Sequence, residues 1–350
     1  MAEEMKLPFY ARLALTLFAI ALIIAFMWAG KSLLVPLFFS FLVAILLHPL
    51  AKYFERHRFP RSLASVVSIL LFLVVFGGLA YFFSHQMVRL TRDLPSVQEK
   101  ISEKWQNIQN WISERYHITN NQQKNYVNKS ASGILNTAVN SVATTFVGIA
   151  ETIILIIFFF IFTFFMLNHR KLLLRFVVEL FDHSHNDKVQ GIISRVRTLI
   201  NSYVQGLLIE MVVVGVIIFI CLKVIGVKYA LLFSIMTAIL NIIPYLGIYF
   251  CMAVTMLVTA TTGTTGEVVA VGIVFLVTHF ADANLILPKV VGGKMKMNPF
   301  ITILAVLIGR LIWGIPGMFL FIPLTAMLRL ISQEVPGMNP WATLISEQKE

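Results

Sequence analysis

Long apolar runs separated by short charged connections fill most of this chain. A membrane-spanning helix needs roughly 20 predominantly apolar residues. About eight segments approach or exceed that length, and they cover Leu13–Ala29, Leu33–Leu50, Leu63–Phe83, Ile149–Leu167, Gly206–Leu222, Ala230–Ala260, Val268–Leu287 and Phe300–Leu330. The pattern therefore predicts an all-α polytopic membrane protein.

The sixth and eighth of these segments are interrupted near their midpoints by proline and glycine. The first break runs from Asn241 to Gly247 and contains Pro244, and the second contains Pro316 and Gly317. An unbroken helix of about 30 residues would reach roughly 45 Å, beyond a hydrocarbon core of about 30 Å, whereas half of it is too short to cross. Because unwound backbone offers carbonyl and amide groups to a solute, such breaks point to a transporter's binding region.

Basic residues predict which connections face the cytoplasm. Lys52, Arg56, Arg58 and Arg61 crowd the connection between the second and third segments, which places that connection inside under the positive-inside rule. The N-terminus is then also cytoplasmic. The first segment is expected to be retained as a span, because Phe26–Gly30 lacks the small residues of a signal-peptide cleavage site.

The second half admits two topologies. If Gly206–Leu222 runs outward, each broken segment is a re-entrant hairpin, and Lys289, Lys294 and Lys296 lie in the cytoplasm. The second half is then an inverted repeat of a span followed by a hairpin, with opposite orientations in the membrane. In the alternative, each broken segment is one long kinked helix and these lysines lie outside.

This topology predicts five regions. In the second region, apolar residues around Trp105 recur at helical spacing, and an amphipathic helix there needs a neighbouring helix, a second subunit or the membrane surface to cover it. The regions are N-terminal spans at 1–86, an extracytoplasmic segment at 87–148, a fourth span with a basic interfacial helix at 149–203, a transport core at 204–335 and a cytoplasmic tail at 336–350.

Composition narrows the function classes. With 58% hydrophobic and 13% charged residues and a mean hydropathy of +0.83, the chain cannot cover a soluble globule with polar surface. The net charge of +11 lies largely in loops beside apolar segments, where it meets anionic lipid rather than nucleic acid. Cys221 and Cys251 fall inside apolar segments and are expected to be packing residues.

Motifs for enzyme chemistry are absent from the sequence. The stretch Ala29–Ser32 resembles the end of a phosphate loop, but Ala25 stands where that loop needs a glycine. Asp182–Asp187 contains two histidines and two aspartates, and its expected role is a hydrated loop rather than a metal site. No enzyme activity, metal or cofactor is therefore predicted.

Polar residues inside the apolar segments carry more information. A charged side chain at the bilayer centre costs roughly 2.5 to 3.5 kcal/mol and tends to face a partner or a cavity. Glu210 has two open interpretations: an ion pair with Arg310, or a carboxylate that couples transport to a proton or cation. Asn241 would cap freed backbone groups or bind a solute, and Asp282 would be structural, interfacial or part of the pathway.

Three motifs in the final third resemble the autoinducer-2 exporter family of bacterial permeases: the run Asn241–Gly247, the run Asn284–Lys289 with Gly292 and Pro299, and the run Gly314–Gly317 with Pro323. The resemblance implies an eight-segment inner-membrane protein that exports small solutes or exchanges sodium for protons, and that forms a homo-oligomer. Many members carry Gln or Glu before the second motif, where this chain has His279 and Asp282. The transported species therefore stays open.

The leading hypothesis is an ion-coupled secondary transporter of the bacterial inner membrane with cytoplasmic termini. Its partners would be the lipid bilayer, a small solute or a monovalent cation and proton, and a second copy of itself. A sodium (cation)/proton antiporter is the alternative, and a non-transporting oligomeric scaffold is a further one. The expected pathway residues are Glu210, Asn241, Pro244, Gly247, His279, Asp282, Asn284, Pro288, Arg310, Pro316 and Gly317.

Overall fold

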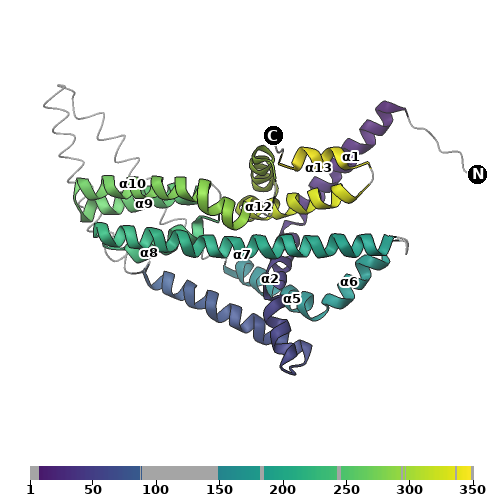
Figure 1. Ribbon diagram of the computed structural model, residues 1–350, viewed down its shortest axis with the longest axis horizontal. Helices are drawn as coiled ribbons and strands as arrows, with labels where there is room; N and C mark the ends of the chain where they lie inside the picture. The colour runs from purple at the N-terminus through teal and green to yellow at the C-terminus, as the bar shows by residue number, and fades with distance from the viewer. Residues whose placement is uncertain are drawn as a thin grey trace, which may run out of the picture. The chain divides into compact units, whose positions relative to one another are not determined.

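A computed structural model describes residues 8–86, 88, 149–181, 185–242, 246–292, 295, 297–335 and 337–347 (Figure 1). Within these ranges the chain is helical, apart from one isolated bridge between Met297 and Ser346. All eight apolar segments predicted from the sequence lie on helices, so the predicted all-α class is confirmed.

The helices follow one another with short connections. The N-terminal part contains α1 (Phe9–Ala29), α2 (Lys31–Arg56) and a third helix, Arg61–Gln86. The remainder contains α5 (Ile149–Asn168), α6 (Arg170–Glu179), α7 (Asn186–Ile225), α8 (Ala230–Leu240), α9 (Leu246–Thr262), α10 (Thr265–Ala281), the π-helices η2 (Asp282–Ile286) and η3 (Pro288–Gly292), α12 (Pro299–Glu334) and α13 (Asn339–Ile345).

Six helices in the described part of the chain are long and apolar enough to cross a membrane, and the number is seven if a bent pair is one span. The bent pair is Ile154–Asn168 with α6, which meet at 73°. At 40 residues, α7 is about 60 Å long and exceeds a hydrocarbon core of about 30 Å. Its basic N-terminal part therefore extends beyond the apolar layer, as predicted for an interfacial helix that continues into a span.

Contacts within the chain define two units, each assembled from separate stretches of sequence. Unit 1 comprises Met1–Ile69, Phe158–Gln205 and Val291–Glu350, and unit 2 comprises Leu70–Ile157 and Gly206–Val290. The first broken segment belongs to unit 2 and the second to unit 1. The five predicted regions, and the opposite orientation of the two broken segments, stay predictions.

In unit 2, α8 packs against α9 and α9 packs against α10. These green helices lie together in Figure 1. A buried apolar cluster joins them to α7, and Phe233, Cys251 and Phe275 are at its centre. Gly247 lies so close to the carbonyl oxygen of Leu240 that a Cβ atom there would overlap it. The break thus brings the end of α8 and the start of α9 into backbone contact, and only glycine fits at this position.

In unit 1, α12 turns back on itself at Gly314. This glycine has φ 67° and ψ −144°, which is not helical. Beyond it, the backbones of Gly309 and Gly317 touch, so that a Cβ atom on either one would overlap the other's carbonyl. Eight residues along a straight helix would be separated by about 12 Å. The second broken segment is therefore a helical hairpin with a glycine crossing below its tip.

The tip of this hairpin is anchored to other helices of unit 1. The indole Nε1 of Trp313 donates a hydrogen bond of 2.9 Å to the backbone carbonyl of Met27 on α1. The Trp313 ring also lies 5.5 Å from the ring of Phe38 on α2 and 5.3 Å from that of Phe321 across the hairpin. Three segments of chain thus converge on one buried aromatic side chain.

Several predicted features lie outside the described residues. They are Pro244 in the first break, the amphipathic helix around Trp105, Lys294 and Lys296, and most of the Asp182–Asp187 stretch.

Candidate functional site

Glu210 is a buried carboxylate on α7, and only 4% of its surface is exposed. Its Oε1 accepts a hydrogen bond of 2.9 Å from the side-chain amide of Asn241. Its Oε2 is buried and has no hydrogen-bond partner among the described residues. A buried carboxylate oxygen without a donor is costly, so this atom marks a place where a proton or cation would be stabilised.

Asn241 lies at the C-terminal end of α8, where the first break begins. Its Nδ2 donates to Glu210 and also to Oδ2 of Asp282, at 3.0 Å. An amide nitrogen carries two hydrogens, so both of its donors are used. Asn241 therefore joins two carboxylates from different helices to the break.

Asp282 follows α10 as the first residue of the π-helix η2 and is 6% exposed. Its Oδ1 is buried without a hydrogen-bond partner in the described chain, like the Oε2 of Glu210. Pro288 has no N–H for the carbonyl of Asn284, and a π-turn is one way for a helix to accommodate such a loss. Such single-turn π-helices are frequent at functional sites.

His279 lies one turn before Asp282 and close enough to act on it electrostatically. Its ring is half-buried and meets the ring of Tyr249 on α9 edge-on, with centroids 5.0 Å apart. Its Nδ1 is buried and has no partner among the described residues. The imidazole thus adds a third unsatisfied polar atom beside the two carboxylates.

The charges at this site are not balanced by lysine or arginine. Neither Glu210 nor Asp282 forms an ion pair with any residue that the structure describes. Two neighbouring carboxylates in an apolar interior repel each other and lose hydration, so the arrangement favours a state in which a proton or cation neutralises charge. The described residues contain no cluster of three or more His, Cys, Asp or Glu side chains suited to a metal ion.

Four of the predicted pathway residues are thus brought together in unit 2: Glu210, Asn241, His279 and Asp282. Gly247 lies just beyond them, at the backbone contact of the first break. Asn284 points elsewhere, since it is exposed and donates to the carbonyl of Phe280 on its own helix at 2.8 Å.

The other predicted pathway residues are distributed differently. Pro288 is exposed at the start of η3. In unit 1, Arg310 and Pro316 are exposed, and Gly317 is buried at the hairpin crossing. The predicted ion pair between Glu210 and Arg310 joins residues of different units and stays a prediction.

Some elements of the site were not predicted. The sequence analysis singled out Glu210, Asn241 and Asp282 one by one, without the shared amide that connects them. It also passed over Tyr249, whose position on an apolar helix gives no polar signal. Gly309 carried a usable signal, because glycines at 309 and 317 flank the break on both sides.

Comparison with known proteins fits this arrangement. The profile of the AI-2E family transporter matches residues 17–337, which is most of the chain. The chain belongs to this transporter family. The family resemblance seen in the sequence motifs is therefore confirmed, and the chain is a multi-pass membrane protein of a transporter family rather than of an enzyme family.

Several relatives match along most of their length. The chain is 27% identical over 315 residues to "Putative transport protein YrrI" of Bacillus subtilis (strain 168), covering 86% of each chain. A protein of the same designation, YhhT of Escherichia coli (strain K12), is 22% identical over 332 residues, covering 95% of this chain and 93% of YhhT. The sodium-lithium/proton antiporter of Halobacillus andaensis is 24% identical over 320 residues, covering 85% of this chain and 89% of the antiporter.

Proposed function

We propose that this AI-2E family transporter is a secondary transporter that exchanges protons for a monovalent cation, with Glu210 and Asp282 as its coupling carboxylates. One observation carries the proposal. Two buried carboxylates share a single amide donor, and each keeps one buried oxygen without a partner. Oxygen ligands of this kind suit small hard cations, and the same oxygens also accept protons.

The exchange follows from electrostatics. A proton bound to one carboxylate and a cation bound between the two both relieve the same repulsion, so each ligand weakens the need for the other. When access to the site alternates between the two sides of the membrane, competition of this kind couples the two fluxes in opposite directions. Asn241 would report the occupancy to the first break, because its amide holds both carboxylates.

The antiporter of Halobacillus andaensis supports a cation as cargo, because it matches this chain over most of both sequences. His279 supports a second candidate, the proton-coupled export of a small polar solute. Its buried Nδ1 has no partner in the described chain, and its ring lies against Tyr249, so a solute could hydrogen-bond to one side chain and stack on the other.

Location and assembly complete the proposal. We place the protein in the bacterial inner membrane with both termini cytoplasmic, on the basis of the basic connection at Lys52–Arg61. The two broken segments would enter the membrane from opposite sides, as facing hairpins of an inverted repeat. A homo-oligomer is part of the proposal because the apolar residues around Trp105 need covering.

Flux measurements in proteoliposomes test this function. Vesicles loaded with sodium, lithium or potassium and a pH-sensitive dye are diluted into cation-free buffer. We expect outward movement of at least one cation to acidify the lumen only when the protein is present. If no cation moves protons, but an outward proton flux accompanies entry of a small polar solute, the second candidate replaces the first. Absence of any coupled flux would contradict both.

A further inference from the structure

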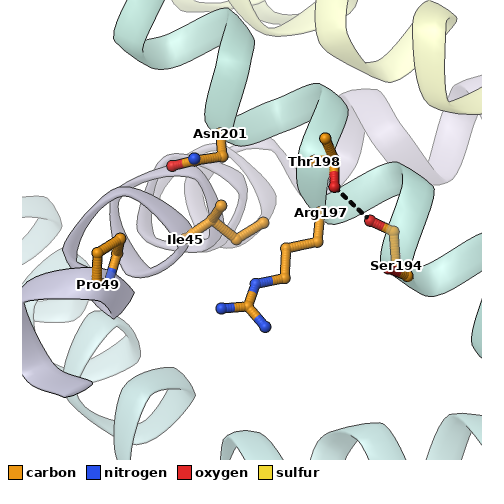
Figure 2. A pocket seen from close by; sticks show the side chains of 6 residues that line it. All are labelled: Ile45, Pro49, Ser194, Arg197, Thr198 and Asn201. Atoms are coloured by element: carbon orange, nitrogen blue, oxygen red, sulfur yellow. Dashed lines mark hydrogen bonds between the residues drawn. The ribbon is translucent and has the colours of Figure 1, made fainter.

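A pocket of about 210 Å³ opens in unit 1 between α2 and α7. Ile45 and Pro49 of α2 form its apolar side. The other side is polar, and it consists of Ser194, Arg197, Thr198 and Asn201 of α7. Figure 2 shows the Arg197 side chain extending from α7 into the open space beside Pro49.

Positive charge collects at this pocket. Arg197, Arg170 and Lys52 all lie within electrostatic range of the His48 imidazole on α2, together with one acidic group, Glu55. Arg170 is already paired with Glu55, to which it donates two hydrogen bonds of 2.7 and 2.5 Å. Arg197 and Lys52 form no ion pair with a described residue. Two cations are therefore left without a neutralising partner.

The pocket also lies where both helices change from apolar to charged. On α2, the apolar run ends near Leu50 and is followed by Lys52 and Arg56. On α7, basic residues up to Arg197 precede the apolar run that starts at Gly206. This is the level at which a membrane-spanning helix meets lipid headgroups, and the basic connection predicts the cytoplasmic leaflet.

We infer that this pocket binds the headgroup phosphate of an anionic phospholipid. Arg197 would bind the phosphate through its guanidinium, with Lys52 adding positive charge nearby. Thr198 already donates its hydroxyl to the carbonyl of Ser194, so Asn201 is the pocket side chain that has an amide to offer. Ile45 and Pro49 would contact the glycerol backbone and the upper acyl chain. Basic pockets between membrane helices bind anionic lipids in this way.

A free phosphate ion would use the same cations, but it would leave the apolar side of the pocket without a ligand. The two sources can be separated by experiment. Purified, delipidated full-length protein is titrated with phosphatidylglycerol or phosphatidylcholine of the same acyl chains, and bound lipids are counted by native mass spectrometry. Parallel titrations contain inorganic phosphate as competitor.

We expect phosphatidylglycerol to bind more tightly than phosphatidylcholine and to resist displacement by millimolar phosphate. Arg197→Gln should weaken the first phosphatidylglycerol by about fivefold, and Lys52→Gln should weaken it in the same direction. The matched control is Lys188→Gln, which removes one exposed charge from the same helix outside the pocket and should bind as the wild type does.

Equal effects of Arg197→Gln and Lys188→Gln would overturn the proposal, and so would equal affinity for the two lipids. Displacement of the lipid by phosphate would assign the pocket to a soluble anion instead. Both arginine and lysine side chains are exposed, so the fold should tolerate each substitution, and a thermal unfolding curve of each variant checks this.

Discussion

Glu210 and Asp282, on different helices of unit 2, accept hydrogen bonds from the same nitrogen, the side-chain amide of Asn241. The donor lies at the end of α8, where the apolar segment breaks. A proton or cation arriving at either carboxylate would change how that carboxylate holds the amide. The break and the charges are therefore parts of one arrangement, and most predictions below concern that arrangement or its counterpart in α12.

Replacing Asn241 by aspartate should destabilise unit 2. The substitution keeps the side-chain shape, removes both hydrogen bonds and adds a third carboxylate. Each buried acceptor left without a donor costs about 1 to 3 kcal/mol. Asn284→Asp is the matched control, because Asn284 is exposed and bonds only to its own helix. Thermal unfolding in detergent should show a clear loss for Asn241→Asp and a small one for the control. Similar losses in both would argue against the shared amide as a structural link.

Alanine at Gly309 should disrupt the α12 hairpin. The added methyl group would overlap the carbonyl of Gly317, and backbone has little room to yield. Forced overpacking costs about 1 to 3 kcal/mol. Gly191→Ala provides the control, because nothing lies within 4 Å of the added atom and alanine favours a helix interior. We expect a lower melting temperature for the first variant and an unchanged or higher one for the second. A Gly309→Ala protein as stable as wild type would contradict the glycine crossing.

Trp313→Phe should weaken the attachment of the hairpin tip to α1. The phenyl ring retains much of the packing but cannot donate to the carbonyl of Met27. Loss of one such hydrogen bond costs about 1 kcal/mol. Trp341→Phe makes the same change at an exposed position on α13 and should leave the melting temperature unchanged. The connection would be refuted if the two variants melted together at the wild-type temperature.

Helices and breaks were accessible from the sequence because both depend on local chemistry. Runs of apolar residues fix where spans lie, and Gly314 and Gly317 supply the freedom and the close approach that a hairpin needs. The first break was recognised in the same way, from Asn241 to Gly247. Local pattern was therefore sufficient to predict an all-helical membrane protein with interrupted segments.

The pairing of functional residues was less accessible, because it depends on how helices pack. The sequence analysis offered Arg310 as a partner for Glu210, since the two are the obvious opposite charges. In unit 2 the structure instead places Glu210 beside Asn241 and Asp282, through the packing of α8 against α9 and α10. The π-turn at Asp282 was equally invisible, because Pro288 alone does not say how the helix will absorb a missing donor.

The central claim is that Glu210 couples cation movement to protons. The most direct test compares Glu210→Gln with Glu267→Gln in proteoliposomes that carry an outward sodium or lithium gradient and a luminal pH dye. Glu267 is the matched control, because it is an exposed carboxylate in the same unit and only caps α10. Both variants should reconstitute, since glutamine keeps the size of the side chain. We predict that Glu267→Gln acidifies the lumen as wild type does, and that Glu210→Gln produces no cation-driven proton flux. Proton flux through Glu210→Gln at the wild-type rate would contradict the account.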